Sequence, residues 1–244
     1  MRRARTLRPI EPVGREHIRF DTIDKRDGGR RVIVHLGERD RLRYAAAVAA
    51  VTPVIEGSLS DGVVANRARV MQGRLELEPW TLASRRYRGA LRAASRGPSR
   101  AAFVGDVRDC YGSISPATVS SALHVMGARR DRVEDLAGIL ASFEARGVRG
   151  LPVGPDPSAV LANAVLAPVD TAVREVAGFA AMRWVDDVVV FTRDVARARR
   201  AASAFHRAVR AVGLEANDSK CRVIDEPDAV IGAGWAASPA RGVT

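Results

Sequence analysis

The 244-residue chain is predicted to adopt an α+β fold, in which a ferredoxin-like antiparallel sheet carries helices on one face. The first observation is the order of the elements expected between residues 101 and 224: strand, helices, strand, strand, helix, strand. The second is composition, because 47% apolar residues are enough to form a core. No uncharged apolar run approaches the ~18 residues of a membrane span, so no membrane partner is expected.

The first hundred residues hold few regular elements. Residues 1–30 are polar and loop-like, and residues 31–34 read as a short strand. An apolar pattern predicts a helix over residues 38–56. A basic helix over residues 83–95 is expected to stop before a Gly-Pro pair.

The elements expected after residue 100 are bounded by capping and turn residues. Helices begin where a hydroxyl or carboxylate side chain precedes proline, and strands are short apolar runs between polar turns. These signals predict a strand over 102–105 leading to Asp106, helical structure from Ser115-Pro116 to Gly147, a helix from Asp156-Pro157 to about residue 176, a hairpin over 179–184 and 188–191, a helix from Asp194 to Gly213 and a strand over 221–224.

The charge balance indicates a class of partner. Lys and Arg total 39 against 28 acidic residues, which gives a net charge of +11. Such an excess favours nucleic acid; the alternative is biased codon usage, since lysine occurs only at Lys25 and Lys220. The only cysteines, Cys110 and Cys221, exclude a disulfide framework. With a basic N-terminus that leads into no apolar stretch, they favour a cytoplasmic protein.

Adjacent carboxylates, Asp186 and Asp187, lie at the turn of the expected hairpin. Aspartate is a common turn residue, but a simple hairpin turn prefers glycine, and two like charges at the edge of an apolar sheet repel and lose solvation. A bound divalent cation would remove both costs. Asp106 is expected to face Asp186 across one strand pair; the alternative for Asp106 is a helix or turn cap.

Three carboxylates at one end of a sheet suit two Mg²⁺ ions, for which Mn²⁺ can substitute. Such a pair of ions clamps the attacking and leaving oxygens of a phosphoryl transfer. Because successive strand residues point to opposite faces, Asp186 and Asp187 cannot be equivalent, and Asp186 is assigned the more direct metal role.

Several short motifs resemble those of reverse transcriptases. None is specific alone, but all occur in the family's order over roughly residues 28–236. They are Asp106 followed by Tyr111; the segment 150–158 with Asn163 and Leu166; the aromatic-x-Asp-Asp box at 184–187; Gly213-Leu214, Asn217 and Lys220; a primer-grip-like segment over 230–235; and finger-like motifs at 29–34, 39–41 and 66–67. The motif style is similar to the bacterial abortive-infection and unassigned defence-type branches.

The resemblance implies a polymerase right-hand palm with fingers. The palm would span residues 101–236 and the fingers 28–100, with an N-terminal basic segment over 1–27 and a short tail over 237–244. No thumb is expected after Trp235, so a partner subunit or self-assembly would hold the duplex. The implied substrates are an RNA template, a DNA or protein primer, and deoxynucleoside triphosphates.

The resemblance also implies roles for individual residues. Catalytic roles fall to Asp106, Asp186, Asp187 and Lys220, and metal ligation to the same three aspartates with Val107. Tyr111 would lie beneath the incoming sugar and exclude a 2′-hydroxyl, with an ordinary core tyrosine as the alternative. The other implied nucleotide-binding residues are Arg30, Arg31, Pro152, Gly154 and Ser158, of which Ser158 has helix capping as its alternative.

Two of these assignments have a physical argument of their own. Arg30 and Arg31 alternate faces on a strand, so only one can reach the triphosphate, and a charged surface strand is the alternative. Lys220 stands in a chain that otherwise uses arginine, and an ammonium can give up a proton where a guanidinium cannot. A general acid for the pyrophosphate leaving group needs that property, although chance placement of one of two lysines is the alternative.

The sequence departs from the family pattern at several positions. Val153 stands where many members carry glutamine, Gly112 where many have a second acid, and Trp184 where tyrosine is usual. The expected function is an RNA-directed DNA polymerase, with a role in anti-phage defence following from the motif style. The alternatives are a degenerate palm that binds RNA or assembles with a partner, and untemplated DNA synthesis.

Overall fold

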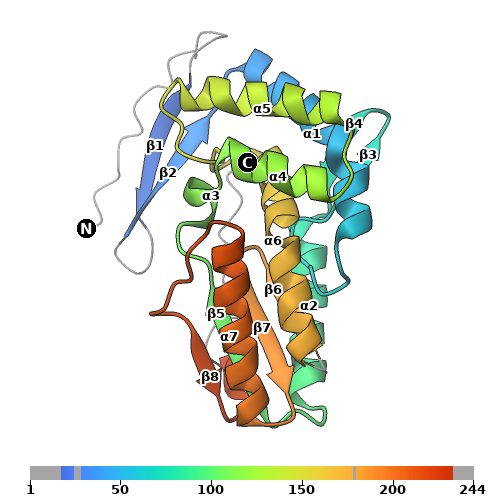
Figure 1. The fold of residues 1–244 in the computed structure, drawn as a ribbon, viewed down its shortest axis with the longest axis vertical. Coiled ribbons are helices and arrows are strands. Elements are labelled where there is room, and N and C mark those ends of the chain that lie inside the picture. The colour runs from blue at the N-terminus through green and yellow to red at the C-terminus, as the bar shows by residue number, and fades with distance from the viewer. Residues whose placement is uncertain (1–17, 25–28, 178–179, 233–244) are drawn as a thin grey trace, which may run out of the picture.

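A four-stranded antiparallel sheet in the order β6-β7-β5-β8 is the largest sheet of the computed structural model, which describes residues 18–24, 29–177 and 180–232. The central strands are β5 and β7, and β8 pairs with the outer edge of β5. The strands are β5 Ala101–Asp106, β6 Ala180–Trp184, β7 Asp187–Thr192 and β8 Arg222–Ile224 (Figure 1). The expected α+β class with an antiparallel sheet is confirmed.

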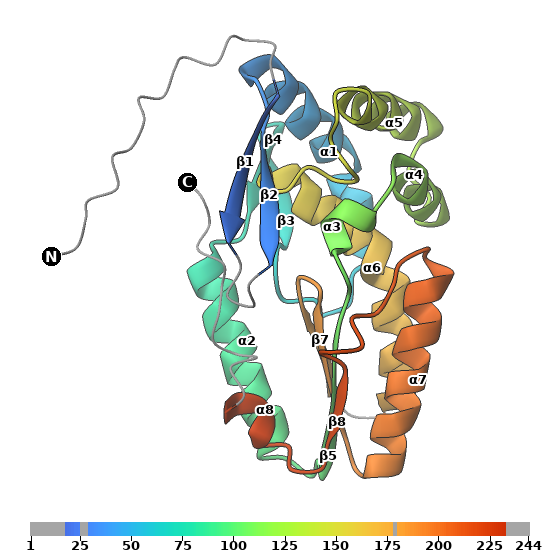
Figure 2. The ribbon, with the colours of Figure 1, turned by 90° about the vertical axis from the view of Figure 1, so that its left-hand side faces the viewer.

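Helices cover both faces of this sheet, so the expectation of helices on one face is wrong. On the first face, the ring of Phe103 lies 5.4 Å from that of Phe205. On the second face, Val104 belongs to a separate apolar cluster with Leu91. The covering helices are α6 (Asp156–Ala177) and α7 (Val195–Ala211) on the first face, and α2 (Trp80–Ser95) and α8 (Ala229–Gly232) on the second (Figure 2).

The physical reason for two covered faces lies in β5 and α2. All six residues of β5 are buried, and its unbroken apolar run up to Asp106 is typical of a strand with no solvent face. In α2, Tyr87, Leu91 and Ala94 are buried at helical spacing and face the sheet, while the arginines between them are exposed. The helix α2 is basic in composition, but it has a narrow apolar stripe that packs against the second face of the sheet.

Helices from residues 38–144 form a second layer, with two small hairpins beside it. Tyr44 of α1 packs edge-on against Phe143 of α5, with ring centroids 5.4 Å apart. The helices are α1 Glu38–Ser58, α3 Cys110–Ser113, α4 Pro116–Val125 and α5 Arg130–Glu144; the hairpins pair β1 Arg19–Asp24 with β2 Arg30–His35 and β3 Ala68–Met71 with β4 Arg74–Leu77.

Two predicted helix caps are confirmed. The Ser115 hydroxyl accepts the backbone N–H of Thr118 at 3.1 Å, and the Asp194 carboxylate accepts that of Arg197 at 2.6 Å. Two features differ from the prediction: residues 19–24, expected to be loop-like, form β1, and the β3–β4 hairpin is not predicted at all. The β3–β4 turn places Gln72 at φ 50 before a positive-φ glycine, and a Gln-Gly turn is a weaker signal than Asn-Gly.

Some expectations concern residues that the structure does not describe. These are residues 1–17 and 25–27 of the basic segment, residues 233–235 of the primer-grip-like segment, and the tail 237–244. The division into fingers and palm at residue 100 stays a prediction. Within the described ranges, no helix has the length and apolarity that a membrane crossing requires.

Gly150 fixes the approach of the segment before α6 to α3. Its φ is +64, and a Cβ there would lie 2.4 Å from the Tyr111 carbonyl oxygen and 2.6 Å from that of Gly112. The N–H of Leu151 donates to the Tyr111 carbonyl at 2.8 Å. Only glycine combines this backbone conformation with so close an approach.

Gly150→Ala is expected to lower the free energy of unfolding by about 3 kcal/mol, because it adds steric overlap to the cost of a positive φ. Gly127→Ala is the matched control: its φ is +81 but nothing lies within 4 Å of its Cβ position, so a loss of about 1 kcal/mol is expected. Urea denaturation measures both. Equal losses would show that the contact with α3 contributes nothing.

Candidate active site

The three predicted carboxylates meet at one end of the sheet. β5 and β7 pair in a register that sets Asp106 directly opposite Asp187. The expectation that Asp106 faces Asp186 is therefore wrong by one residue. The cause is the hairpin itself, because Trp184 pairs with Asp187 and leaves Val185 and Asp186 as its two turn residues.

Burial makes these carboxylates hard to ionise together. Asp106 is only 4% exposed. Burial, with the charge of Asp106, raises the pKa of the Asp186 carboxyl to about 6. Burial, with the charges of Asp186 and Asp106, raises the pKa of Asp187 to about 8. The ionised carboxylates are therefore poorly solvated at this end of the sheet, and a bound cation would stabilise them.

Asp106 is held by two side chains from the segment after α7. The Asn217 amide donates to Oδ1 at 2.8 Å, and Lys220 Nζ lies 3.0 Å from Oδ2. The backbone N–H of Asn217 also donates to the Asp106 carbonyl at 2.8 Å. Asn217 was noted as part of a motif but was not predicted as a site residue. Its position three residues before Lys220 was the available signal.

Lys220 is a cation in this arrangement. Burial opposes its charge, but the bond to Asp106 and the charges of Asp187 and Asp186 outweigh burial and raise the pKa of the ammonium. Its side chain is 44% exposed, so one side of it reaches solvent. The assignment as general acid stays a prediction, and its protonated state is the one that such a role requires.

The residues at this sheet end fit a hard divalent cation. Carboxylate oxygens are the ligands that Mg²⁺ and Mn²⁺ take, and Val107, whose N–H donates to the Asp186 carbonyl at 3.3 Å, adjoins the same turn. Among the residues that the structure describes, no group of three or more His, Cys, Asp or Glu side chains has a geometry that could hold an ion. In this structure both carboxylate oxygens of Asp106 are engaged, one by Asn217 and the other by Lys220.

Tyr111 lies in α3, just beyond the left-handed residue Asp109 (φ 42). Burial raises the pKa of the Tyr111 hydroxyl, and the charge of Asp186 adds to the shift. The ring is therefore within electrostatic range of the carboxylates.

The two arginines of β2 differ in their surroundings. Arg30 is exposed and lies 3.9 Å from Asp24 of the neighbouring strand. Arg31 is half-buried, and its charge lowers the pKa of Asp186 against the larger effects of burial and Asp106. Arg31 therefore lies within electrostatic range of Asp186.

The segment around Gly154 docks on β2. Val34 N–H donates to the Val153 carbonyl at 2.8 Å, and a Cβ on Gly154 (φ +125) would lie 3.3 Å from the Val34 oxygen. The close approach that this glycine permits is thus to β2, and Pro152 before it is buried. A nucleotide contact by either residue stays a prediction.

Ser158 lies in the core. It is fully buried, and its hydroxyl is 3.1 Å from that of Tyr44. In this position the hydroxyl joins α6 to α1. The nucleotide contact of Ser158 stays a prediction.

A sheet with carboxylates at one end, helices on its faces and a lysine beside the first carboxylate is the arrangement of a nucleic-acid polymerase palm. Residues 23–233 match the family model described as reverse transcriptase (RNA-dependent DNA polymerase). The chain belongs to this family.

Solved structures agree on the fold. The structure is similar to apo telomerase from Candida tropicalis truncated from its C-terminal domain, with a TM-score of 0.55 and 11% identity. The match covers 88% of this chain and 51% of that one, so the chain spans about half of that protein's length. No curated protein matches the chain.

The pKa shifts predict how stability depends on pH and Mg²⁺. The pKa values of Asp186 and Asp187 are raised above those of the unfolded chain, so the folded protein binds more protons between about pH 4 and pH 8. In EDTA, these groups should lower the free energy of unfolding as pH rises through that window. Mg²⁺ should therefore raise the melting temperature more at pH 8 than at pH 5.

Calorimetric melting with and without Mg²⁺ measures this effect. Asp187→Asn is the control, because it removes the carboxyl with the more strongly raised pKa. It should make the free energy of unfolding in EDTA depend less on pH. The same Mg²⁺ effect at both pH values in the wild type would contradict the assignment.

Proposed function

We propose that the chain is an RNA-directed DNA polymerase that adds deoxynucleotides to a primer by two-metal phosphoryl transfer. The observation that carries the proposal is the meeting of Asp106, Asp186 and Asp187 at one buried sheet end, in a chain of the reverse transcriptase family. The family also supports an RNA template and nucleotide substrates.

Each residue would have a separate task in this reaction. Asp106, Asp186, Asp187 and the Val107 carbonyl would hold the ions. Bound Mg²⁺, or Mn²⁺ in its place, would supply charge stabilisation to the attacking and leaving oxygens. Arg31 would bind the triphosphate, because its charge already acts on Asp186. Lys220 would donate its proton to the pyrophosphate as it leaves.

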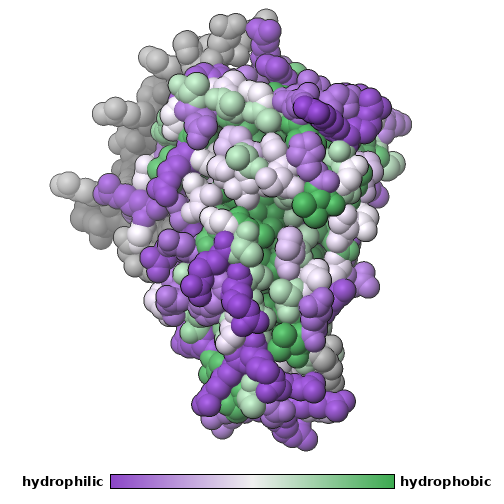
Figure 3. Space-filling model, viewed as in Figure 1, coloured by the Kyte–Doolittle hydropathy of each residue, from purple (hydrophilic) through white to green (hydrophobic). Residues whose placement is uncertain are grey.

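Exposed arginines on two helices would contact the nucleic-acid backbone. On α2, Arg85, Arg88 and Arg92 are exposed, whereas Arg86 is bound to Glu78 at 2.6 Å. The helix α7 contains no acidic residue, and hydrophilic side chains follow it across the surface in Figure 3. Its exposed arginines are Arg199, Arg200, Arg207 and Arg210. A partner subunit or self-assembly would complete the grip on the duplex.

The degenerate-palm alternative is less favoured. Gathering three carboxylates in a buried site is costly, and a protein that only binds RNA gains nothing from them. Untemplated synthesis would use the same chemistry, and an assay with and without template separates it from the proposal. Anti-phage defence and a cytoplasmic location stay predictions from the sequence.

Asp186→Asn is expected to reduce nucleotide incorporation by at least ~10²-fold while the protein stays folded, because a neutral amide cannot replace the charge at a cation site. Primer extension on an RNA template measures the rate, and circular dichroism measures the fold. Asp131→Asn is the control, since Asp131 is a surface carboxylate whose ion pairs, in the described part of the chain, are with Arg129 and Arg132. Extension by the Asp186 variant at the wild-type rate would refute the site.

Tyr111→Ala is expected to raise the ratio of ribonucleotide to deoxynucleotide incorporation by ~10-fold or more, because it removes the volume that meets a 2′-hydroxyl. Tyr111→Phe keeps the ring and should leave the ratio unchanged. Single-nucleotide extension with each substrate gives the ratio. If alanine changes stability but not the ratio, Tyr111 is an ordinary core residue.

A further inference from the structure

The catalytic turn contains a strained residue. Val185 has φ +57, a conformation that a β-branched side chain rarely adopts. It directly precedes Asp186, so the conformation of Val185 decides where that carboxylate points. Strain of this kind persists only where the surrounding structure imposes it.

The side chain of Arg183 binds the turn at its strained residue. Its Nη1 donates to the Val185 carbonyl at 2.7 Å, across the turn from its own position on β6. The residue is only 1% exposed, so water does not compete for this hydrogen bond. A charged donor in such surroundings makes a strong bond.

The guanidinium is itself fixed by two side chains of α6. Nε and Nη2 donate to the two carboxylate oxygens of Asp170 at 2.8 and 2.9 Å, which makes a bidentate pair. Nη1 also donates to Asn163 Oδ1 at 2.8 Å. The ion pair with Asp170 balances the buried charge without help from Val185. The bond to the turn is therefore additional to what burial of the arginine requires.

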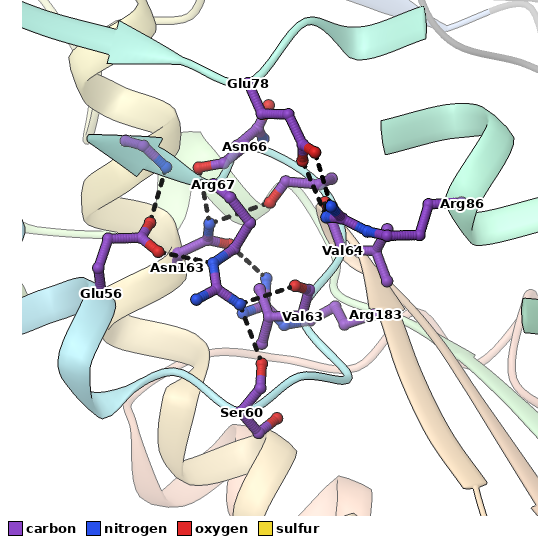
Figure 4. Close-up of polar contacts among 12 residues, drawn as sticks. Glu56, Ser60, Val63, Val64, Asn66, Arg67, Glu78, Arg86, Asn163 and Arg183 are labelled. Carbon is purple, nitrogen blue, oxygen red and sulfur yellow. Dashed lines mark hydrogen bonds and ion pairs between the residues drawn. The ribbon is translucent and has the colours of Figure 1, made fainter. Parts of the chain in front are cut away.

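The loop between α1 and β3 holds the network from the other side. The Asn163 amide donates to the carbonyls of Ala65 and Asn66 at 3.1 and 3.2 Å. The backbone N–H of Arg183 donates to the Gly62 carbonyl at 2.8 Å. Figure 4 shows Arg183 and Asn163 side by side beneath this loop.

A second arginine gives the loop its shape. Arg67 binds Glu56 at 2.6 Å and donates to the carbonyls of Ser60 and Val63 at 3.2 and 3.3 Å (Figure 4). It does not contact the catalytic turn in any described interaction. Arg67 therefore acts on the Arg183 network through the shape of this loop.

We propose that Arg183 is a positioning residue for the reaction: through the Val185 carbonyl it keeps the turn in its left-handed conformation and so aims Asp186 at the cation site. Asp170 and Asn163 hold the guanidinium in place. The role rests on the proposed function, but the geometry of the turn can be tested without nucleotide chemistry.

The test is rescue by glycine. Arg183→Lys keeps a positive charge for Asp170. It lacks the planar guanidinium, whose nitrogens together bind Asp170, Asn163 and the Val185 carbonyl. It should weaken Mn²⁺ binding, followed by electron paramagnetic resonance, and slow primer extension by at least 10-fold. Adding Val185→Gly should restore both at least several-fold, because glycine adopts positive φ without strain. Val185→Gly alone is the reference for the pair.

Arg146→Lys is the matched control, because Arg146 binds Asp40 and the Ser142 carbonyl and takes no part in this network in the described interactions. It removes a similar guanidinium, and its effects should not be rescued by Val185→Gly. If Arg183→Lys does not fold, Asn163→Ala loosens the same guanidinium while it leaves the Asp170 pair intact, and the same rescue is expected at smaller size.

Three outcomes would overturn the inference. They are wild-type Mn²⁺ affinity in a folded Arg183→Lys protein, no rescue by glycine in either loosened variant, and equal rescue of Arg146→Lys. If the wild type binds Mn²⁺ as expected but extends no primer, the proposed function fails, and the metal-binding rescue still decides the role of Arg183.

Discussion

The placement of three carboxylates at the buried end of one sheet is the constraint on which the surrounding structure depends. β5 is covered on both faces, so Asp106 ends a strand with little access to water. Like charges in such a place are tolerated only with compensation. Asn217 and Lys220 bind Asp106, and the charge of Arg31 acts on Asp186. Segments far apart in the sequence thus converge because each brings a donor or a positive charge.

The departures from the family pattern have physical reasons in the structure. Gly112 stands where many members have an acid, and a Cβ there would lie 2.6 Å from the carboxylate of Asp109. The exposed side chain of Asp109 would have to shift to admit a larger residue there. Trp184 replaces the usual tyrosine, and its ring lies 5.3 Å from that of Tyr87 on α2. The larger ring joins the catalytic hairpin to the helix that covers the second face.

The sequence predicted those parts of the fold that depend on local chemistry. The caps at Ser115 and Asp194 and the hairpin that carries Asp186 have signals within a few residues of each other. The carboxylates were also identifiable, since charged residues at the end of apolar strands are unusual. These features need no knowledge of what lies across the sheet.

Features that depend on distant partners were not predictable in the same way. The register of β5 against β7 sets Asp106 opposite Asp187. This register depends on which two residues form the turn between β6 and β7. Ser158 matches a motif, yet its hydroxyl meets Tyr44, which lies more than a hundred residues away. Arg183 reads as one basic residue among many, and only the three-dimensional structure gives it Asp170 as a partner.

The bond between Lys220 and Asp106 has a consequence for the order of events. In this structure the ammonium is the counterion of Asp106, at 3.0 Å from one of its carboxylate oxygens. In the proposed reaction, a metal ion held by Asp106 would compete with the ammonium for the same carboxylate. Binding of the ion would then free Lys220 to donate its proton, so metal binding and the availability of the proton donor would be coupled.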